Sequence, residues 1–262
     1  MSEAALYVGC DVGSSRTKVA VIDAAGRILG LAVRKSGTDF TATAEACLAE
    51  ALAAAGADAG RIARAVSTGY GRLNVRYAHE QRTEIGCHAG GCYHAFPRTI
   101  TVIDIGGQDN KVIKLDAGGR RTGFKMNRKC AAGTGAFLEE MAARLDIPLE
   151  RMNAMAERST DMVRLGSFCT VFSATEVLEH IRHGKKIEDI VKGVFYSMIK
   201  RIVEMDSLTA EVVMTGGVVA HNPYLVRMME ELIGRPVLVP PHPQFTGAIG
   251  AALYARSGSG EP

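Results

Sequence analysis

Two stretches of the sequence share one pattern, in which an aspartate is followed by a glycine and then by a lysine. The stretch from Asp11 to Asp23 matches the stretch from Asp104 to Asp116 at the first Asp, the Gly after it, the Lys, the Val that follows the Lys and the final Asp. Each copy begins where an apolar run ends and leads into a second apolar run, a pattern typical of a strand, a tight turn and another strand. The repeat therefore predicts two related half-molecules, each with the same turn.

The residue types in these turns suit the binding of an anion. Glycine lets the backbone take left-handed conformations and approach a phosphate closely, so that main-chain N–H groups can point at it. The Asp would face a Mg²⁺ ion through water, because Mg²⁺ keeps much of its hydration shell. A structural hairpin is the alternative for a single turn, but two copies on duplicated strands favour phosphate binding. The residues expected to contact phosphate are Gly13, Ser14, Ser15, Lys18, Gly106 and Gly107.

Two further glycine clusters follow in the second half of the chain. Thr215, Gly216 and Gly217 come directly after the apolar run Val212 to Met214, where a backbone can pass close to a nucleoside. The second cluster begins at Gly247, and we interpret it as a surface for tight helix packing. The sequence contains neither the P-loop motif nor the Rossmann glycine fingerprint, so the nucleotide folds that carry those motifs are excluded.

The elements that must position the turns follow from periodicity. An α/β layer with a mixed sheet is predicted by the order strand, strand, strand, helix and strand, over Leu6–Val12, Lys18–Asp23, Ile28–Val33, Ala42–Ala55 and Ala63–Thr68. We expect a first domain over 1–98 and a second over 99–256, with a mainly helical insertion at about 148–205. Residues 257–262 are expected to form a disordered tail.

Asp11-x-Gly, Asp104-x-Gly-Gly and the Thr215-Gly-Gly turn, in this order on duplicated halves, resemble the actin-like ATPase superfamily of actin, heat-shock chaperones and sugar kinases. The resemblance implies two ribonuclease-H-like domains with ATP and Mg²⁺ in a cleft between them and a hinge. Asp11 and Asp104 would then hold the hydrated metal. Gln108 is our candidate for positioning the attacking water, and a solvent-facing turn residue is the alternative.

Two cysteines, Cys130 and Cys169, each stand just before an amphipathic run that predicts a helix. Helix N-termini favour anions, so a sulfur in this position is suited to act as a nucleophile or a metal ligand. Two buried, inert thiols are the alternative for an isolated pair.

The sequence motifs around these cysteines favour a reactive or metal-binding role over inert thiols. Asp104-Ile-Gly-Gly-Gln-Asp, Lys129-Cys-Ala-Ala-Gly-Thr-Gly, Cys169-Thr-Val-Phe and Val213-Met-Thr-Gly-Gly-Val resemble the ATP-dependent activators of 2-hydroxyacyl-CoA dehydratases, a family that includes ATPase subunits of benzoyl-CoA reductase. The resemblance implies that Cys130 and Cys169 bind iron, and it adds Gly133 and Gly135 to the cofactor-binding residues. A [4Fe-4S] cluster takes four thiolates and one chain offers two of them here, so a two-fold homodimer would share one cluster.

The same resemblance implies an ATP-hydrolysing electron donor. Ferredoxin or flavodoxin would supply the electron, and ATP would drive it to a 2-hydroxyacyl-CoA dehydratase. The chain departs from the family pattern at Ala174 and Thr175, where an acidic residue and a serine are usual, and this keeps a benzoyl-CoA-type reductase subunit open as the alternative. A small-molecule kinase of the same fold and a chaperone-like interaction protein are the more distant alternatives.

Cys87, His88, Cys92 and His94 form a rival cluster that could bind Zn²⁺, but the spacing fits no zinc finger and we interpret the segment as a structural helix. The net charge of +3 is spread along the chain and indicates no nucleic-acid partner. No apolar run approaches the roughly 20 residues of a membrane span. Without a signal-peptide pattern, the six cysteines favour a reducing cytoplasm.

Overall fold

The computed structural model describes residues 5–127, 131–166 and 169–258. Contacts divide these residues into two compact units. The first unit contains the chain up to Thr99, the segment Leu115–Thr122 and the residues from Pro240 onward, and the second contains Ile100–Lys114 and Gly123–Val239. The chain therefore returns to the first unit at its C-terminal end, whereas the sequence had assigned everything from 99 to 256 to one domain.

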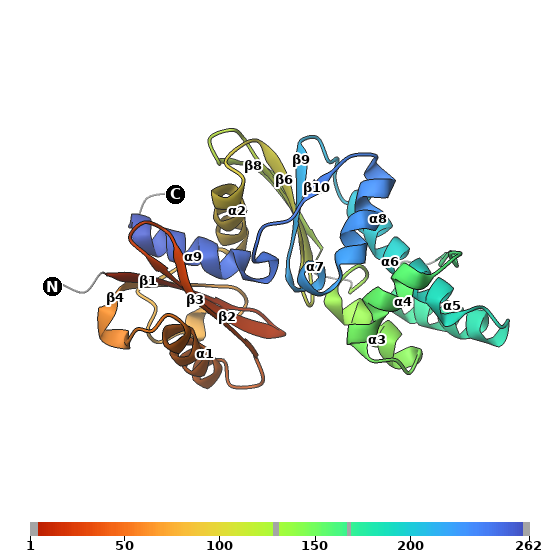
Figure 1. The fold of residues 1–262 in the computed structure, drawn as a ribbon, viewed down its shortest axis with the longest axis horizontal. Coiled ribbons are helices and arrows are strands. Elements are labelled where there is room, and N and C mark those ends of the chain that lie inside the picture. Colours follow the sequence, from red (N-terminus) through yellow and green to blue (C-terminus); the bar gives the residue numbers. More distant parts are fainter. Residues whose placement is uncertain (1–4, 128–130, 167–168, 259–262) are drawn as a thin grey trace. The chain divides into compact units, whose positions relative to one another are not determined.

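The first unit is a mixed five-stranded sheet with the strand order β3-β2-β1-β4-β5 (Figure 1). β1 pairs antiparallel with β2 and parallel with β4. The predicted order of strands and helix is confirmed, and the first predicted strand has the observed bounds. Its elements are β1 (Leu6–Val12), β2 (Arg16–Asp23), β3 (Ile28–Lys35), α1 (Phe40–Ala54), η1 (Ala59–Arg61), β4 (Ile62–Thr68), η2 (Arg72–Asn74), β5 (Glu80–Gln81), α2 (Glu84–Ala95), η4 (Pro243–Phe245) and α9 (Thr246–Ser257).

Alternating side chains give the first sheet two apolar faces. Leu6, Val8 and Cys10 of β1 are buried in one cluster with residues of α1. Ala20 and Ile22 of β2 are buried in another cluster with residues of α9. The period of two along each strand thus places α1 on one face and α9 on the other.

The second unit repeats the strand order of the first. Its sheet runs β10-β9-β6-β7-β8, in which β9 pairs parallel with both β6 and β10. The central strand of each sheet is the first strand of its half, flanked by the second and fourth strands of that half, which is the duplication that the repeated turns predict. The strands are β6 (Ile100–Ile105), β7 (Asn110–Leu115), β8 (Arg121–Asn127), β9 (Glu211–Thr215) and β10 (Val237–Leu238).

Helices pack on the second sheet around one large apolar core. Ile103 and Ile105 of β6 lie in this core with Phe137, Met198 and Leu225 from three different helices. The described elements between β8 and β9 are all helical, including those over the predicted insertion. They are α3 (Gly135–Arg144), η3 (Leu149–Arg151), α4 (Met152–Arg158), α5 (Thr170–Arg182) and α6 (Ile187–Val203), and α7 (Gly217–His221) and α8 (Pro223–Ile233) follow β9.

Two remaining expectations concern the end of the chain and membrane spans. Ser257 is the last residue of α9, so this position of the predicted tail is helical, and residues 259–262 lie outside the described part. Within residues 5–127, 131–166 and 169–258, no helix combines the length and the apolar character that crossing a bilayer requires.

Candidate functional site

The first-unit turn joins β1 to β2 and holds a buried carboxylate. Asp11 is 4% exposed and stands opposite Lys18 in the antiparallel register of these strands. This register brings Lys18 Nζ to 3.0 Å from Asp11 Oδ2. The Gly13 N–H donates to the Arg16 carbonyl at 3.1 Å and closes the turn. A Cβ on Gly13 would lie 2.9 Å from that carbonyl oxygen, so the turn requires glycine here.

Two serines lie at the tip of the first-unit turn. Ser14 is exposed and Ser15 is half-buried, so both are positioned where a ligand outside the sheet can reach the turn. The turn is fixed from β3 and its continuation, because Ser36 Oγ donates to the Gly13 carbonyl at 2.6 Å and the Ser36 N–H donates to the Ser15 carbonyl at 3.1 Å. The first-unit turn is thus anchored within its own sheet.

The second-unit turn joins β6 to β7 and repeats the pairing of aspartate with lysine. Asp104 is 2% exposed, and Lys111 Nζ donates to Asp104 Oδ2 at 2.9 Å. The same ammonium group donates to Asp109 Oδ1 at 2.8 Å, and the Lys111 side chain is 2% exposed. The Gly106 N–H donates to the Asp109 carbonyl at 2.9 Å, as the Gly13 N–H does to Arg16 in the first unit. Gln108 is exposed at the tip of this turn.

A second glycine turn lies beside the buried carboxylate of the second unit. Asp104 pairs with Thr215 across β6 and β9, and Gly216 follows with a φ of 102°. A Cβ on Gly216 would lie 2.4 Å from the Ile105 carbonyl oxygen and 2.7 Å from Asp104 Oδ1. Gly216 therefore lets the turn at the end of β9 close directly on the carboxylate.

The first unit has the equivalent turn, and sequence reasoning missed it. Asp11 pairs with Thr68 across β1 and β4, and Gly69 follows with a φ of 86°. A Cβ on Gly69 would lie 2.5 Å from Asp11 Oδ1. The signal was the Thr-Gly pair that ends the matching strand of each half, which is weaker here than the Thr-Gly-Gly of the second half.

The second-unit turn is also bound to the start of α3. The N–H groups of Gly135 and Ala136 donate to the carbonyls of Gly106 and Gly107 at 2.9 and 2.8 Å. Gly133 precedes this helix with a φ of 81°, a conformation that L-residues rarely adopt. Gly133 and Gly135 thus bring the start of α3 to the turn, while Cys130 and its two predecessors lie outside the described residues.

Cys169 is described and occupies the N-cap position of α5, where it is half-buried. The Ser173 N–H donates to the Cys169 carbonyl at 2.8 Å and begins the helix. Glu176, further along the helix, accepts a hydrogen bond at 2.6 Å from the Gly166 N–H on the segment that leads to the cysteine. Ala174 is buried and Thr175 is exposed, so the departure from the family pattern falls partly inside this helix packing.

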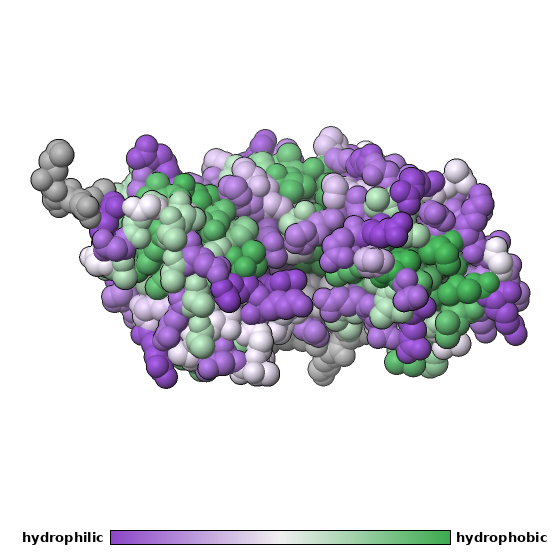
Figure 2. All heavy atoms as spheres, turned by 60° about the horizontal axis from the view of Figure 1, so that its bottom comes forward, coloured by the Kyte–Doolittle hydropathy of each residue, from purple (hydrophilic) through white to green (hydrophobic). Residues whose placement is uncertain are grey.

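α5 exposes apolar side chains next to Cys169. Val171 is 71% exposed and Phe172 is 64% exposed, and Leu178 and Ile181 continue the exposed apolar set along the helix. A pocket of about 370 Å³ between α3 and α5 is lined by residues that include Glu140, Arg144, Thr170, Val171 and Leu178. Figure 2 shows apolar surface over the helical part of the second unit.

Comparison with known proteins identifies the family of this chain. The family model described as the BadF/BadG/BcrA/BcrD ATPase family matches residues 8–255, which is nearly the whole chain. The chain belongs to this family of ATPases.

Two relatives and one solved structure match almost the full length of this chain. A 2-hydroxyisocaproyl-CoA dehydratase activator from Clostridioides difficile is 41% identical over 95% of this chain and 94% of the relative. An activator of lactoyl-CoA dehydratase from Anaerotignum propionicum is 42% identical over 95% and 96%. The structure of the activator of the 2-hydroxyisocaproyl-CoA dehydratase from Clostridium difficile with bound ADPNP has a TM-score of 0.90 at 41% identity, covering 96% of this chain and 94% of that one. ADPNP is an ATP analogue, so this likeness supports nucleotide binding.

More distant likenesses bear on the fold and on one alternative. A ROK family glucokinase from Streptomyces griseus has a TM-score of 0.58 at 16% identity, over 97% of this chain and all of that one, which supports the predicted actin-like fold and nothing further. One of the subunits of the benzoyl-CoA reductase of Thauera aromatica is 30% identical over 64% of this chain and 62% of that protein. The predicted family resemblance and fold class are both confirmed.

The rival cysteine and histidine cluster lies on α2 of this ATPase. Cys87 and Cys92 are fully buried, and burial raises the pKa of the Cys87 thiol to about 12, which disfavours the thiolate that a metal requires. His94 is exposed, whereas His88 is buried with Nδ1 3.0 Å from Thr246 Oγ1. Over the described residues, these four side chains together do not form a group close enough to share an ion.

Proposed function

We propose that this chain is an ATP-hydrolysing iron–sulfur electron donor that activates a 2-hydroxyacyl-CoA dehydratase by low-potential single-electron transfer. The proposal rests on the family, on the names of relatives that span almost the full chain, and on a connection between the second-unit turn and the start of α3, which follows Cys130 in the sequence. Ferredoxin or flavodoxin would be the electron donor, and the homodimer would be the working form.

The turns suit Mg²⁺ and ATP by the chemistry of their donors. Asp11 and Asp104 are buried carboxylates at strand ends, and each is flanked by a glycine where any Cβ would collide with it. Carboxylates that hold the waters of a hydrated Mg²⁺ are the usual protein contribution to such sites. Lys18 would contact the phosphates of ATP, together with the turn residues Gly13, Ser14, Ser15, Gly106 and Gly107. The residues near the nucleoside would be Thr215, Gly216 and Gly217.

For hydrolysis, Gln108 would orient the attacking water, because it is exposed at the tip of the second-unit turn and carries both a donor and an acceptor. The backbone N–H groups of the turns are held by the sheet before any ligand arrives. Such fixed donors stabilise charge that develops on the phosphoryl oxygens without reorganising during the reaction.

The cysteines suit an iron–sulfur cluster by donor type. Cys169 is half-buried at a helix N-cap, where the backbone favours negative charge, and Cys130 lies just before the described segment that leads into α3. When bound, the cluster would supply a low-potential one-electron carrier. With two thiolates from each chain, a two-fold homodimer provides the four that a [4Fe-4S] cluster takes.

The observation that carries the proposal is the pair of hydrogen bonds from the start of α3 to the second-unit turn. The carbonyls of Gly106 and Gly107 accept from the N–H groups of Gly135 and Ala136. A phosphate that draws the N–H groups of this turn moves the carbonyls on the same peptides, and these carbonyls hold the helix after Cys130. Nucleotide state and cysteine position would therefore be linked, which is what ATP-driven electron transfer requires.

The exposed apolar side chains of α5 support the proposal that another protein binds to this helix. Val171 and Phe172 closely follow Cys169 in the sequence and are more than half exposed. An apolar surface next to a redox ligand would exclude water from the path of the electron once a protein covers it. The second copy of the chain and the dehydratase are the two partners that the proposal names.

The deciding experiment measures iron, sulfide and nucleotide affinity after anaerobic purification. Replacing Cys130 or Cys169 by Ala should remove the iron, since two of the four ligands of the dimer are lost, while the affinity for an ATP analogue stays within about twofold. Cys87→Ala and Cys92→Ala are the matched controls and should keep the iron. Full iron content in the Cys130 and Cys169 variants would refute the shared cluster.

The hydrolysis part of the proposal has a separate test. Asp11→Asn and Asp104→Asn should each abolish ATP hydrolysis and leave the iron in place, because the carboxylates and the cysteines belong to different segments. Full ATPase activity in both variants would contradict the proposed Mg²⁺ site.

A benzoyl-CoA-type reductase subunit is the second candidate, favoured by the 30% identity with the Thauera aromatica protein. The two candidates differ in the component that receives the electron. Turnover of a 2-hydroxyacyl-CoA by a purified dehydratase, dependent on this protein, ATP and a low-potential reductant together, supports the first. Turnover of an aryl-CoA by a reductase core under the same dependence supports the second.

A further inference from the structure

Three segments of the first unit are packed backbone to backbone around Asp11. A Cβ on Gly9 of β1 would lie 1.9 Å from the Ala248 carbonyl oxygen, so the strand lies directly on α9. A Cβ on Gly250 of α9 would lie 1.8 Å from the Cys87 carbonyl oxygen, and one on Gly91 of α2 would lie 2.1 Å from the Thr246 carbonyl oxygen. Without side chains between them, β1, α9 and α2 are held at fixed distances from one another.

This packing brings a histidine of α2 to the carboxylate of β1. His88 is 6% exposed, and its Nδ1 lies 3.0 Å from Thr246 Oγ1 at the start of α9. Its other ring nitrogen, Nε2, lies 3.1 Å from the point where a Cβ on Gly247 would stand. Asp11 Oδ2 lies 3.1 Å from that same point. The missing side chain of Gly247 therefore lets the imidazole and the carboxylate share one space.

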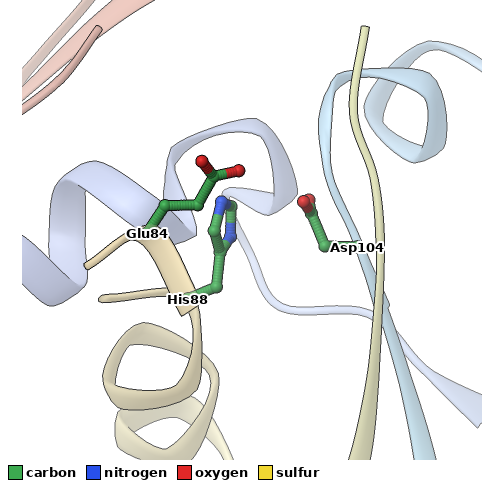
Figure 3. Close-up of side chains that lie close together, drawn as sticks. All are labelled: Glu84, His88 and Asp104. Carbon is green, nitrogen blue, oxygen red and sulfur yellow. The ribbon is translucent and has the colours of Figure 1, made fainter. Parts of the chain in front are cut away.

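A second carboxylate, on α2 itself, lies next to this imidazole. Glu84 precedes His88 by one helical turn, and the two side chains place ligand atoms within 4.8 Å of each other. Figure 3 shows the Glu84 carboxylate beside the ring of His88, both extending from α2, whereas the third labelled residue, Asp104, belongs to the second unit. Glu84 is half-buried, so its oxygens remain within reach of water.

We propose that Glu84 and His88 belong to the Mg²⁺-nucleotide site of the first unit, with Glu84 as a further acceptor for the waters of the hydrated ion and His88 as the residue that positions it. This inference rests on the proposed function. It assigns α2 a role in binding, where the sequence indicated only structure.

The chemistry follows from what each group can donate. A carboxylate accepts hydrogen bonds from the waters around Mg²⁺, and Asp11 and Glu84 are both carboxylates. In the proposed arrangement the Thr246 hydroxyl would donate to Nδ1 of His88, which would leave the ring proton on Nε2 available to Glu84. A hydrogen-bonded outer group of this kind orients an acceptor and fixes the histidine tautomer, and its loss typically costs roughly tenfold to a hundredfold in metal affinity.

The test measures the Mg²⁺ concentration that half-saturates binding of a non-hydrolysable ATP analogue. Glu84→Gln and His88→Asn should each raise this concentration about tenfold. His88→Gln should keep it within about threefold, because a glutamine amide can stand where Nε2 stands, whereas an asparagine amide reaches only the place of Nδ1. Analogue binding without Mg²⁺ should be the same in all variants and in the unchanged protein.

Asp11→Asn is the reference that separates this inference from the proposed function. If Asp11→Asn loses the Mg²⁺ dependence and His88→Asn keeps it, the role of α2 is wrong and the nucleotide site stands. If Asp11→Asn also keeps the dependence, the proposed site itself is wrong.

The anchor of the histidine provides a second comparison. Thr246→Ser should behave as the unchanged protein, and Thr246→Val should resemble His88→Asn. Equal losses in the Asn and Gln variants of His88, or a loss of Mg²⁺-free binding in both, would mean a purely structural role and would overturn the inference.

Discussion

The two turns share a sequence pattern and a geometry, yet their lysines are in different surroundings. The Lys18 side chain is 15% exposed and bonds one carboxylate, that of Asp11. The Lys111 side chain is 2% exposed and bonds two, those of Asp104 and Asp109. The position of Asp109 corresponds to Arg16 in the first unit, so only the second turn has the additional carboxylate. An ammonium group with three donors retains capacity for phosphate at Lys18 and is more fully used by the protein at Lys111.

The turns also differ in what holds them. In the first, the Gly13 carbonyl accepts from Ser36 Oγ, within the same unit. In the second, the carbonyls of Gly106 and Gly107 accept from the N-terminus of α3. Duplication thus produced one turn that is fixed by its sheet and one that is connected to the helix after Cys130. Under the proposed function, the first turn would mainly bind the nucleotide, and the second would also transmit its state to α3.

The largest expected effect comes from the glycine that closes on the second carboxylate. Gly216→Ala should destabilise the protein by about 4 kcal/mol, because a φ of 102° is strained for alanine and its Cβ would collide with Ile105 and Asp104. Gly37→Ala is the control, since its φ of 60° also strains an alanine but nothing lies within 4 Å of its Cβ. The control should lose only about 1 kcal/mol. Urea unfolding of both variants measures the difference, and equal losses would mean that the close approach to Asp104 is unimportant.

Variants of Lys18 and Lys111 test whether the first lysine mainly binds phosphate and the second mainly stabilises the fold. Lys111→Met should cost about 3 kcal/mol of unfolding free energy, because it leaves two carboxylates without their buried cation. Lys18→Met should cost less stability, because its pair is more exposed, and should instead raise the KM for ATP by about tenfold, the loss of one charge-assisted hydrogen bond to phosphate. Urea unfolding and steady-state ATPase kinetics on both variants provide the comparison. If the stability loss were larger for Lys18→Met, the assignment of the two lysines would be reversed.

The duplication and most strands could be predicted from the sequence because they depend on local patterns. The apolar run Leu6–Val12 defines β1 without any knowledge of its neighbours, and the repeated Asp, Gly and Lys positions indicate the second half. The unit to which α9 belongs could not be predicted in this way. Its membership depends on Gly9 and Gly250, which allow backbone contacts between segments far apart in the sequence.

The sequence draws attention to candidate site residues where several glycines stand together, and it does not where a single glycine stands alone. Thr215-Gly-Gly drew attention to Gly216, whereas the single Gly69 resembles any loop glycine until its φ and its distance to Asp11 are known. The sequence indicates a structural His88, because the spacing of the cysteines and histidines around it fits no zinc finger and the segment is predicted to be a helix. Its bond to Thr246 is a contact between residues 158 positions apart, which no local pattern contains.

The connection between the second turn and α3 can be weakened at Gly133. Gly133→Ala should cost about 1 to 2 kcal/mol, since its φ is 81° and its Cβ would lie 2.9 Å from Asn110 Nδ2. Affinity for an ATP analogue should stay within about twofold, while the effect of nucleotide on the rate of iron release to a chelator should shrink. Gly123→Ala, where nothing lies within 4 Å of the new Cβ, should leave that effect intact. An unchanged nucleotide effect in the Gly133 variant would mean that the hydrogen bonds to α3 do not transmit.

The last comparison concerns the thiols of the first unit, which are buried, whereas Cys169 in the second unit is half-buried. Burial raises the pKa of Cys10, Cys47 and Cys87 from 9.0 to about 12. At a mildly alkaline pH this lowers the thiolate fraction about a thousandfold, so iodoacetamide should label these residues far more slowly in the folded protein than after unfolding.

The same shifts predict how stability depends on pH. The unfolded chain releases these thiol protons near a pKa of 9.0, whereas the folded protein keeps them until about pH 12. Their contribution to the unfolding free energy is therefore complete below pH 9.0 and falls as the pH rises through this window, by up to about 1.4 kcal/mol per pH unit for each thiol. Urea unfolding under reducing, anaerobic conditions, on either side of the lower pKa, should show a smaller decline for Cys10→Ala than for the unchanged protein. Equal declines would mean that the Cys10 thiol ionises alike in the folded and unfolded states.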